Sequence, residues 1–175
     1  MRHRSMWRLG CCGAALLMAG LVFGCGRQAA APAASPALAP YVGTSLGAAT
    51  APVAVEAFLP IRNGCQDVLG LYLVQAAREF PDLVRVQILD MHSVEGRGRL
   101  EAHGLRCAAV LVQGSTRFDL GDDGGKVLLE GPMDPLDVHR VLQRELQPLM
   151  PAGVALTAPP AGGAPTAEQR RQAGF

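Results

Sequence analysis

The sequence predicts an α/β domain with a mixed central sheet and helices on both faces, in the order βαβαββα. Along residues 53–149 the hydrophobic pattern alternates between strand-like and helical periods, and glycine and proline separate the segments. Residues 25–52 and 150–175 are rich in Ala, Pro and Gly and cannot bury enough apolar surface to offset chain entropy. We therefore expect a signal segment (1–24), a flexible tether (25–52), one domain (53–149) and a disordered tail (150–175).

The first half of the domain predicts a strand, a helix, a second strand and a second helix. Residues 53–59 (VAVEAFL) are a continuous apolar run, typical of a buried strand. Residues 65–80 have apolar side chains at helical spacing, and Pro81 ends that helix. Residues 83–90 (LVRVQILD) alternate and are rich in branched side chains, which favours a strand parallel to the first. Residues 93–104 (SVEGRGRLEAHG) predict a helix despite two internal glycines.

The second half predicts three strands and a closing helix. Residues 107–114 (CAAVLVQG) form a short apolar run, and residues 116–120 and 126–131 are strand-like segments on either side of the turn GDDGG. The short turn requires these last two strands to be antiparallel. Residues 134–146 begin with a capping Asp and a Pro at the first helical position, which predicts a helix.

The N-terminus has the features of a secretory signal. The basic stretch MRHRSMWR precedes an apolar run that is short for a membrane span of about 20 residues. The run closes with VFGC, which resembles the lipobox of bacterial lipoproteins. The resemblance implies cleavage before Cys25 and attachment of lipid to Cys25. Gly26, in place of Asp, is typical of sorting to the outer membrane of Gram-negative bacteria.

The five cysteines separate by their position in the chain. Cys11 and Cys12 leave with the signal segment, and Cys25 carries the lipid. Only Cys65 and Cys107 remain as thiols in the domain. Because an exported protein works where disulfides persist, these two allow either one intramolecular bridge or two free thiols.

Charge and motif spacing argue against several other functions. The chain has a formal charge of +1, and removal of the signal segment leaves 13 basic and 15 acidic residues, which gives no basic surface for nucleic acid. GDDGGK lacks the residues of a phosphate-binding loop. The soft ligands Met91, His92, His103, Cys65 and Cys107 lack metal-site spacing. We expect no metal, no cofactor and no nucleic-acid partner, and no small-molecule substrate is evident from the sequence.

The order of these segments, with their residues, resembles the thioredoxin-like fold over residues 53–149. No single motif carries the resemblance; four consecutive stretches do. The resemblance implies a three-layer sandwich around a mixed sheet. The matching stretches are VAVEAFLPIRNGC, VRVQILD, EAHGLRCAAVLVQG and GKVLLEGPMDPLDVHRVLQREL.

Two departures from the family pattern concern its redox chemistry. The family motif is C-x-x-C, but here Cys65 matches the second cysteine and Arg62 or Asn63 stands at the first. Ala109 matches the family's cis-proline, and without proline a cis bond costs several kcal/mol. Cys107 lies two residues earlier, in a loop that faces the redox turn in the family. The resemblance therefore implies that Cys65 and Cys107 can form one disulfide.

Two functions remain open for this pair. Cys65 lies at a predicted helix N-terminus, where a thiolate is stabilised, so it could attack in thiol–disulfide exchange or sensing, with Cys107 as its partner. Alternatively, the bridge is structural and the domain is a non-catalytic module that binds an envelope protein. The missing C-x-x-C favours a protein that is not an enzyme. In both cases we expect a lipoprotein anchored through Cys25 to the outer membrane of a bacterium, facing the periplasm.

Overall fold

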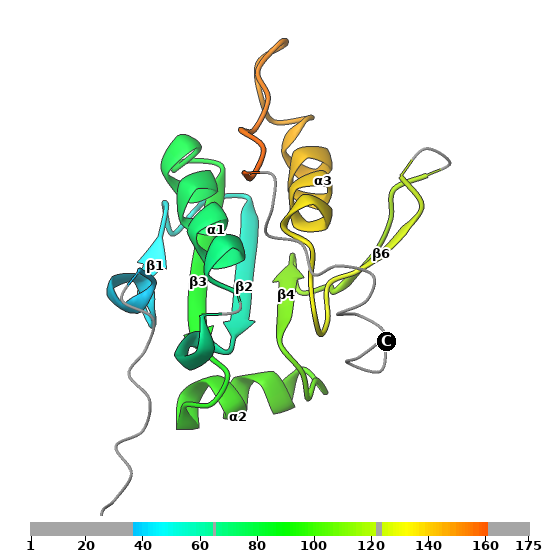
Figure 1. Ribbon diagram of the computed structural model, residues 1–175. Coiled ribbons are helices and arrows are strands. Elements are labelled where there is room, and N and C mark those ends of the chain that lie inside the picture. Colours follow the sequence, from blue (N-terminus) through cyan, green and yellow to red (C-terminus); the bar gives the residue numbers. More distant parts are fainter. Residues whose placement is uncertain (1–36, 65, 122–123, 161–175) are drawn as a thin grey trace, which may run out of the picture. The chain divides into compact units, whose positions relative to one another are not determined.

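A four-stranded mixed sheet forms the centre of the fold, with the strand order β1-β3-β2-β4 (Figure 1). The computed structural model describes residues 37–160 except 65 and 122–123. Parallel pairing of β2 with β3, and antiparallel pairing of β2 with β4, confirm the predicted mixed sheet. The strands are β1 (Ser45–Leu46), β2 (Val53–Leu59), β3 (Val84–Asp90) and β4 (Ala109–Val112).

Three α-helices follow the predicted segments. Helix α1 (Asp67–Glu79) connects the parallel strands β2 and β3, as the sequence predicts. Helix α2 (Val94–Ala102) connects β3 to β4, and α3 (Pro135–Leu146) closes the domain. The predicted cap of α3 is confirmed, because the Asp134 side chain accepts a hydrogen bond from the backbone N–H of Leu136. Two short 3₁₀ helices, η1 (Ala39–Tyr41) and η2 (Ile61–Asn63), precede β1 and α1.

The hairpin that the sequence predicts around GDDGG forms a separate two-stranded sheet. Strands β5 (Arg117–Asp119) and β6 (Lys126–Leu128) pair antiparallel. The chain after β6 returns to the central sheet, where the Val110 N–H donates to the Leu129 carbonyl over 3.0 Å. Figure 1 shows the hairpin extending away from the helices.

The main core lies between the sheet and the helices α1 and α3. Alternate positions of β2, β3 and β4 face this layer, and each is apolar. Helix α1 contributes Leu69, Tyr72, Leu73, Ala76 and Ala77, all nearly inaccessible to solvent. Burial of these side chains is the main stabilising contribution that the structure shows.

A smaller core lies on the opposite face of the sheet, under α2. It consists of Phe58 of β2, Leu89 of β3, Ala109 and Leu111 of β4, and Leu100 of α2. The molecule therefore has helices on both faces of its sheet. This arrangement is compatible with a three-layer α/β fold.

The packed core extends beyond both ends of the expected domain, residues 53–149. Leu38 is fully buried against α1, where Gly70 leaves room for it; a Cβ at that glycine would lie 2.5 Å from the Leu38 Cδ1 atom. On the C-terminal side, Leu156 is 4% exposed, and its backbone N–H donates to the Gln143 side chain over 2.8 Å. Isolated apolar residues in Ala- and Pro-rich segments have no periodic pattern, so the sequence did not predict these contacts.

Candidate functional site

Only one of the two predicted thiols lies in the described part of the chain. Cys107 is exposed, and it makes no disulfide with any of the described residues. Cys65 and the lipidation site Cys25 lie outside the described residues. The expected pairing of Cys65 with Cys107 therefore stays a prediction.

Cys107 lies two residues before β4, which begins beside the end of β2. Ala109 pairs with Phe58 in the antiparallel ladder between β4 and β2. The ladder ends at this pair, and Cys107 lies at a bend just before it. After β2 the chain continues from Pro60 through η2 toward α1, which begins at Asp67. Cys107 thus lies at the end of the sheet that also carries the chain segment leading to α1.

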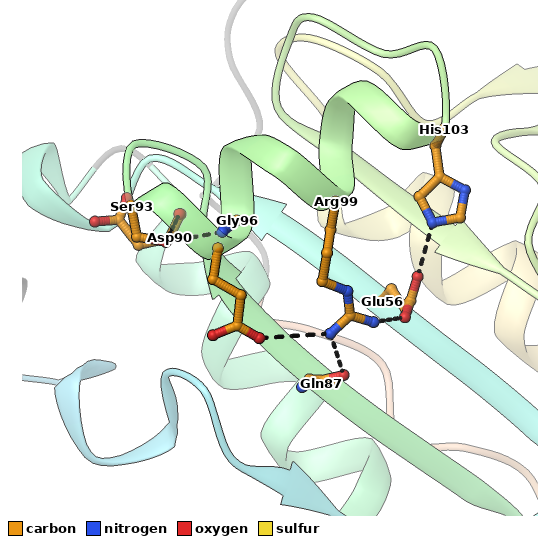
Figure 2. Close-up of polar contacts among 8 residues, drawn as sticks. Glu56, Gln87, Asp90, Ser93, Gly96, Arg99 and His103 are labelled. Atoms are coloured by element: carbon orange, nitrogen blue, oxygen red, sulfur yellow. Dashed lines mark hydrogen bonds and ion pairs between the residues drawn. The ribbon is translucent and has the colours of Figure 1, made fainter.

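Asp90, the last residue of β3, organises the same end of the sheet. Its side chain pairs with Arg62 of η2 over 3.5 Å and accepts the His92 backbone N–H over 3.0 Å. Its carbonyl oxygen accepts the Ser93 hydroxyl over 2.7 Å. Ser93 in turn caps α2 by accepting the Gly96 N–H (Figure 2). Asp90 therefore connects η2 with the start of α2.

The other end of α2 is held by a charged cluster on the sheet, shown in Figure 2. Arg99 points at the sheet, where its guanidinium pairs with Glu56 of β2 and donates to the Gln87 side chain of β3 over 2.9 Å. His103, just after α2, lies 3.1 Å from the second carboxylate oxygen of Glu56. Its ring also meets Phe58 edge to face, with centroids 6.0 Å apart.

The sheet register explains why these side chains meet. Glu56 and Gln87 are direct partners in the parallel ladder between β2 and β3, so both point to the face that α2 covers. Arg99 reaches both because α2 crosses that face. The cluster fixes α2, and α2 leads within five residues from its last residue, Ala102, to Cys107.

The sequence predicted a helix over residues 93–104 but not the contacts that two of its residues make with the sheet. Arg99 is half-buried in α2 and contacts the sheet, and His103 stays exposed while its ring lies 3.1 Å from a Glu56 carboxylate oxygen. A usable signal was present: Glu56 and Gln87 are polar residues inside two apolar strands, and such positions need partners when partly buried.

Two other kinds of feature, metal sites and membrane-spanning helices, can be assessed for the described residues. Among them, no group of three or more His, Cys, Asp or Glu side chains could hold a metal ion. None of the described helices is long and apolar enough to cross a membrane.

Comparison of this chain with protein-family models, curated proteins and solved structures returns no match.

Proposed function

We propose that this protein is an exported bacterial lipoprotein whose thioredoxin-like domain carries out thiol–disulfide exchange or thiol sensing through Cys65 and Cys107. Lipid on Cys25 would anchor it to the outer membrane, facing the periplasm. The mixed sheet with helices on both faces is compatible with the three-layer arrangement that the thioredoxin-like resemblance implies. A client protein of the envelope is the partner that this chemistry requires.

One observation carries the proposal: the exposed Cys107 thiol lies at the end of the sheet from which the chain runs to α1. Cys65 comes two residues before α1 in the sequence. The two cysteines are 42 positions apart in the sequence, and the elements on either side of Cys65, η2 and α1, follow the end of β2 beside which β4 begins. A disulfide requires Cα atoms within about 7 Å, and we propose that the two cysteines meet this condition.

The exchange has two balanced steps. The Cys65 thiolate attacks one sulfur of a client disulfide, which forms a mixed disulfide and releases the other client sulfur as a thiolate. The Cys107 thiolate then attacks the Cys65 sulfur and releases the second client thiolate. The client gains two electrons, and the Cys65–Cys107 pair becomes oxidised. The reverse sequence oxidises a client dithiol.

A redox titration tests the proposal. Residues 26–175 keep every described core residue, unlike residues 53–149, and suit the experiment. The chain is equilibrated in dithiol buffers of graded potential, and free thiols are trapped and counted by mass. We expect a two-electron transition above about −300 mV, the range of labile bridges. The variants Cys65→Ser and Cys107→Ser should each abolish it.

The alternative function, a non-catalytic binding module with a structural bridge, predicts a different titration. The transition would lie below about −300 mV, and reduction would be accompanied by loss of folding measured by circular dichroism. The function would then have to be sought on the surface of the domain.

A further inference from the structure

A pocket of about 640 Å³ lies beside α2, separate from the charged cluster of Glu56, Arg99 and His103. Its walls come from the loop after β3, from α2 and from the loop after α2. Its volume falls in the range of small-molecule sites in proteins, about 300–1,000 Å³. The lining residues are Met91, His92, Arg97, Leu100, Glu101, Gly104, Leu105 and Arg106.

The apolar part of this pocket is the outer surface of the smaller core. Leu100 is buried in that core, and Met91 and Leu105 pack against it while remaining partly exposed. Their side chains present apolar surface in a concave site, where a ligand with an alkyl or aryl body would remove it from water.

The charged part of the pocket has an excess of positive charge. Arg97 and Arg106 are exposed, and within the described part of the chain neither side chain makes an ion pair or hydrogen bond. The neighbouring acids are engaged elsewhere, Asp90 with Arg62 and Glu56 with Arg99. Glu101 is the one acid in the lining, so the pocket holds two guanidinium groups and one carboxylate.

We propose that this pocket binds a small amphipathic carboxylate, with its apolar chain on Met91 and Leu105 and its carboxylate between Arg97 and Arg106. A planar guanidinium pairs well with a carboxylate and supplies charge-assisted hydrogen bonds. An uncharged ligand would leave both arginines unpaired, and a purely polar anion would leave the apolar surface exposed. The two halves of the pocket therefore select a ligand that has both properties. The inference goes beyond the thiol chemistry and does not depend on it.

The test is a titration of residues 26–175 with octanoate, followed by nuclear magnetic resonance, with octanamide as the uncharged analogue. We expect saturable shifts of the backbone amides of Leu100, Gly104 and Leu105, and at least about tenfold weaker binding of octanamide. Such a difference corresponds to about 1.4 kcal/mol. Absence of shifts in the pocket with octanoate, or equal binding of octanamide, would overturn the proposal.

Variants localise the carboxylate. Arg97→Gln and Arg106→Gln should each weaken octanoate binding severalfold and leave octanamide binding unchanged. Arg117→Gln is the matched control, because Arg117 is an exposed arginine on the hairpin strand β5. If Arg117→Gln reduced octanoate binding and the two pocket variants did not, the ligand would lie at the hairpin and the proposal would be wrong. Because the readout is binding and not redox potential, it succeeds or fails independently of the proposed thiol exchange.

Discussion

The sheet face that carries α1 and α3 is apolar at every strand position that points to it, whereas the face that carries α2 is apolar at one end and charged at the other. On the first face, two helices bury a large hydrophobic core. On the second face, α2 buries only Leu100 and Gly96. Its other contacts with the sheet are polar and involve Asp90, Glu56 and their hydrogen-bond partners. The first face therefore provides most of the stability. The second positions the loop that leads to Cys107, through fewer and weaker contacts.

The substitution with the largest expected effect on stability lies on the apolar face. Leu73 is fully buried in α1, and Leu73→Ala should lower the free energy of unfolding by about 2–5 kcal/mol, because it leaves a cavity in the main core. Urea denaturation of residues 26–175 measures this. Leu71, on the same helix, is 40% exposed, so Leu71→Ala should change the free energy by no more than about 0.5 kcal/mol. Equal losses in the two variants would contradict the assignment of the core.

The contact between α2 and β3 can be tested with two glycines of one helix. A Cβ at Gly96 would lie 2.1 Å from the Asp90 carbonyl oxygen, so Gly96→Ala must displace the backbone and should cost about 1–3 kcal/mol. At Gly98 nothing lies within 4 Å, and Gly98→Ala should stabilise the helix by up to about 1 kcal/mol. The two changes should thus have opposite signs in denaturation experiments. The same sign would mean that α2 does not approach β3 as described.

The charged cluster should contribute less than either packing contact. Arg99→Gln removes the pairing with Glu56 in a partly exposed site, and we expect a loss of about 1 kcal/mol. A double-mutant cycle with Glu56→Gln should show coupling between the two residues. Glu95, which lies 3.8 Å from Arg99 and is more exposed, serves as the control, with a coupling to Arg99 of about 0.3 kcal/mol. A larger coupling energy between Arg99 and Glu95 than between Arg99 and Glu56 would show that Glu56 is not the main partner of Arg99.

The smallest expected effect is a pH dependence of the free energy of unfolding, caused by His139 on the apolar face. His139 of α3 lies 3.0 Å from the Tyr72 hydroxyl of α1, and burial lowers the pKa of His139. Burial also raises the pKa of Tyr72, and nearby Glu79 adds to this, so the phenol stays neutral. Below pH about 6.5 the unfolded chain takes up a proton at His139 that the folded chain resists. The contribution of His139 to stability should therefore be complete above about pH 6.5 and be lost as the pH drops below that value.

The variant His139→Gln tests this dependence. It should reduce the slope of unfolding free energy against pH between about pH 5 and 7. At pH 8 His139 is neutral in both the folded and the unfolded chain, so the difference between variant and parent there reports the lost contact with Tyr72 alone. An unchanged slope would show that another group causes any acid sensitivity.

Most elements of the fold could be predicted because each has a local signal, but β1 lies in the segment expected to be a tether and was not predicted. Changes in the spacing of apolar residues predicted β2, α1 and β3, and the pair Asp134 and Pro135 predicted the start of α3. The burial of Leu38 and Leu156 could not be predicted, because each is a single apolar residue in a segment of Ala and Pro. Their burial depends on where α1 and α3 leave apolar surface uncovered, which is a property of the assembled domain.

The sequence marks Glu56 and Gln87 as polar positions inside apolar strands, but it could not show which residues they meet. Glu56 and Gln87 are 31 positions apart and meet only because β2 and β3 pair in one particular register. A shift by one residue would turn one of them to the apolar face. Cys107, by contrast, could be named from the small number of cysteines outside the signal segment, and the structure shows that it is exposed. Its relation to Cys65 came from the resemblance to a known fold and stays a prediction.

The most direct test of the proposed thiol pair is a count of free thiols after oxidation. Residues 26–175 are incubated with an oxidised dithiol, denatured without reductant, treated with an alkylating reagent and weighed by mass spectrometry. We predict that no alkyl group is added and that digestion yields one linked peptide containing Cys65 and Cys107. Two alkylated thiols in the monomeric chain would contradict the pairing, and with it the proposed exchange.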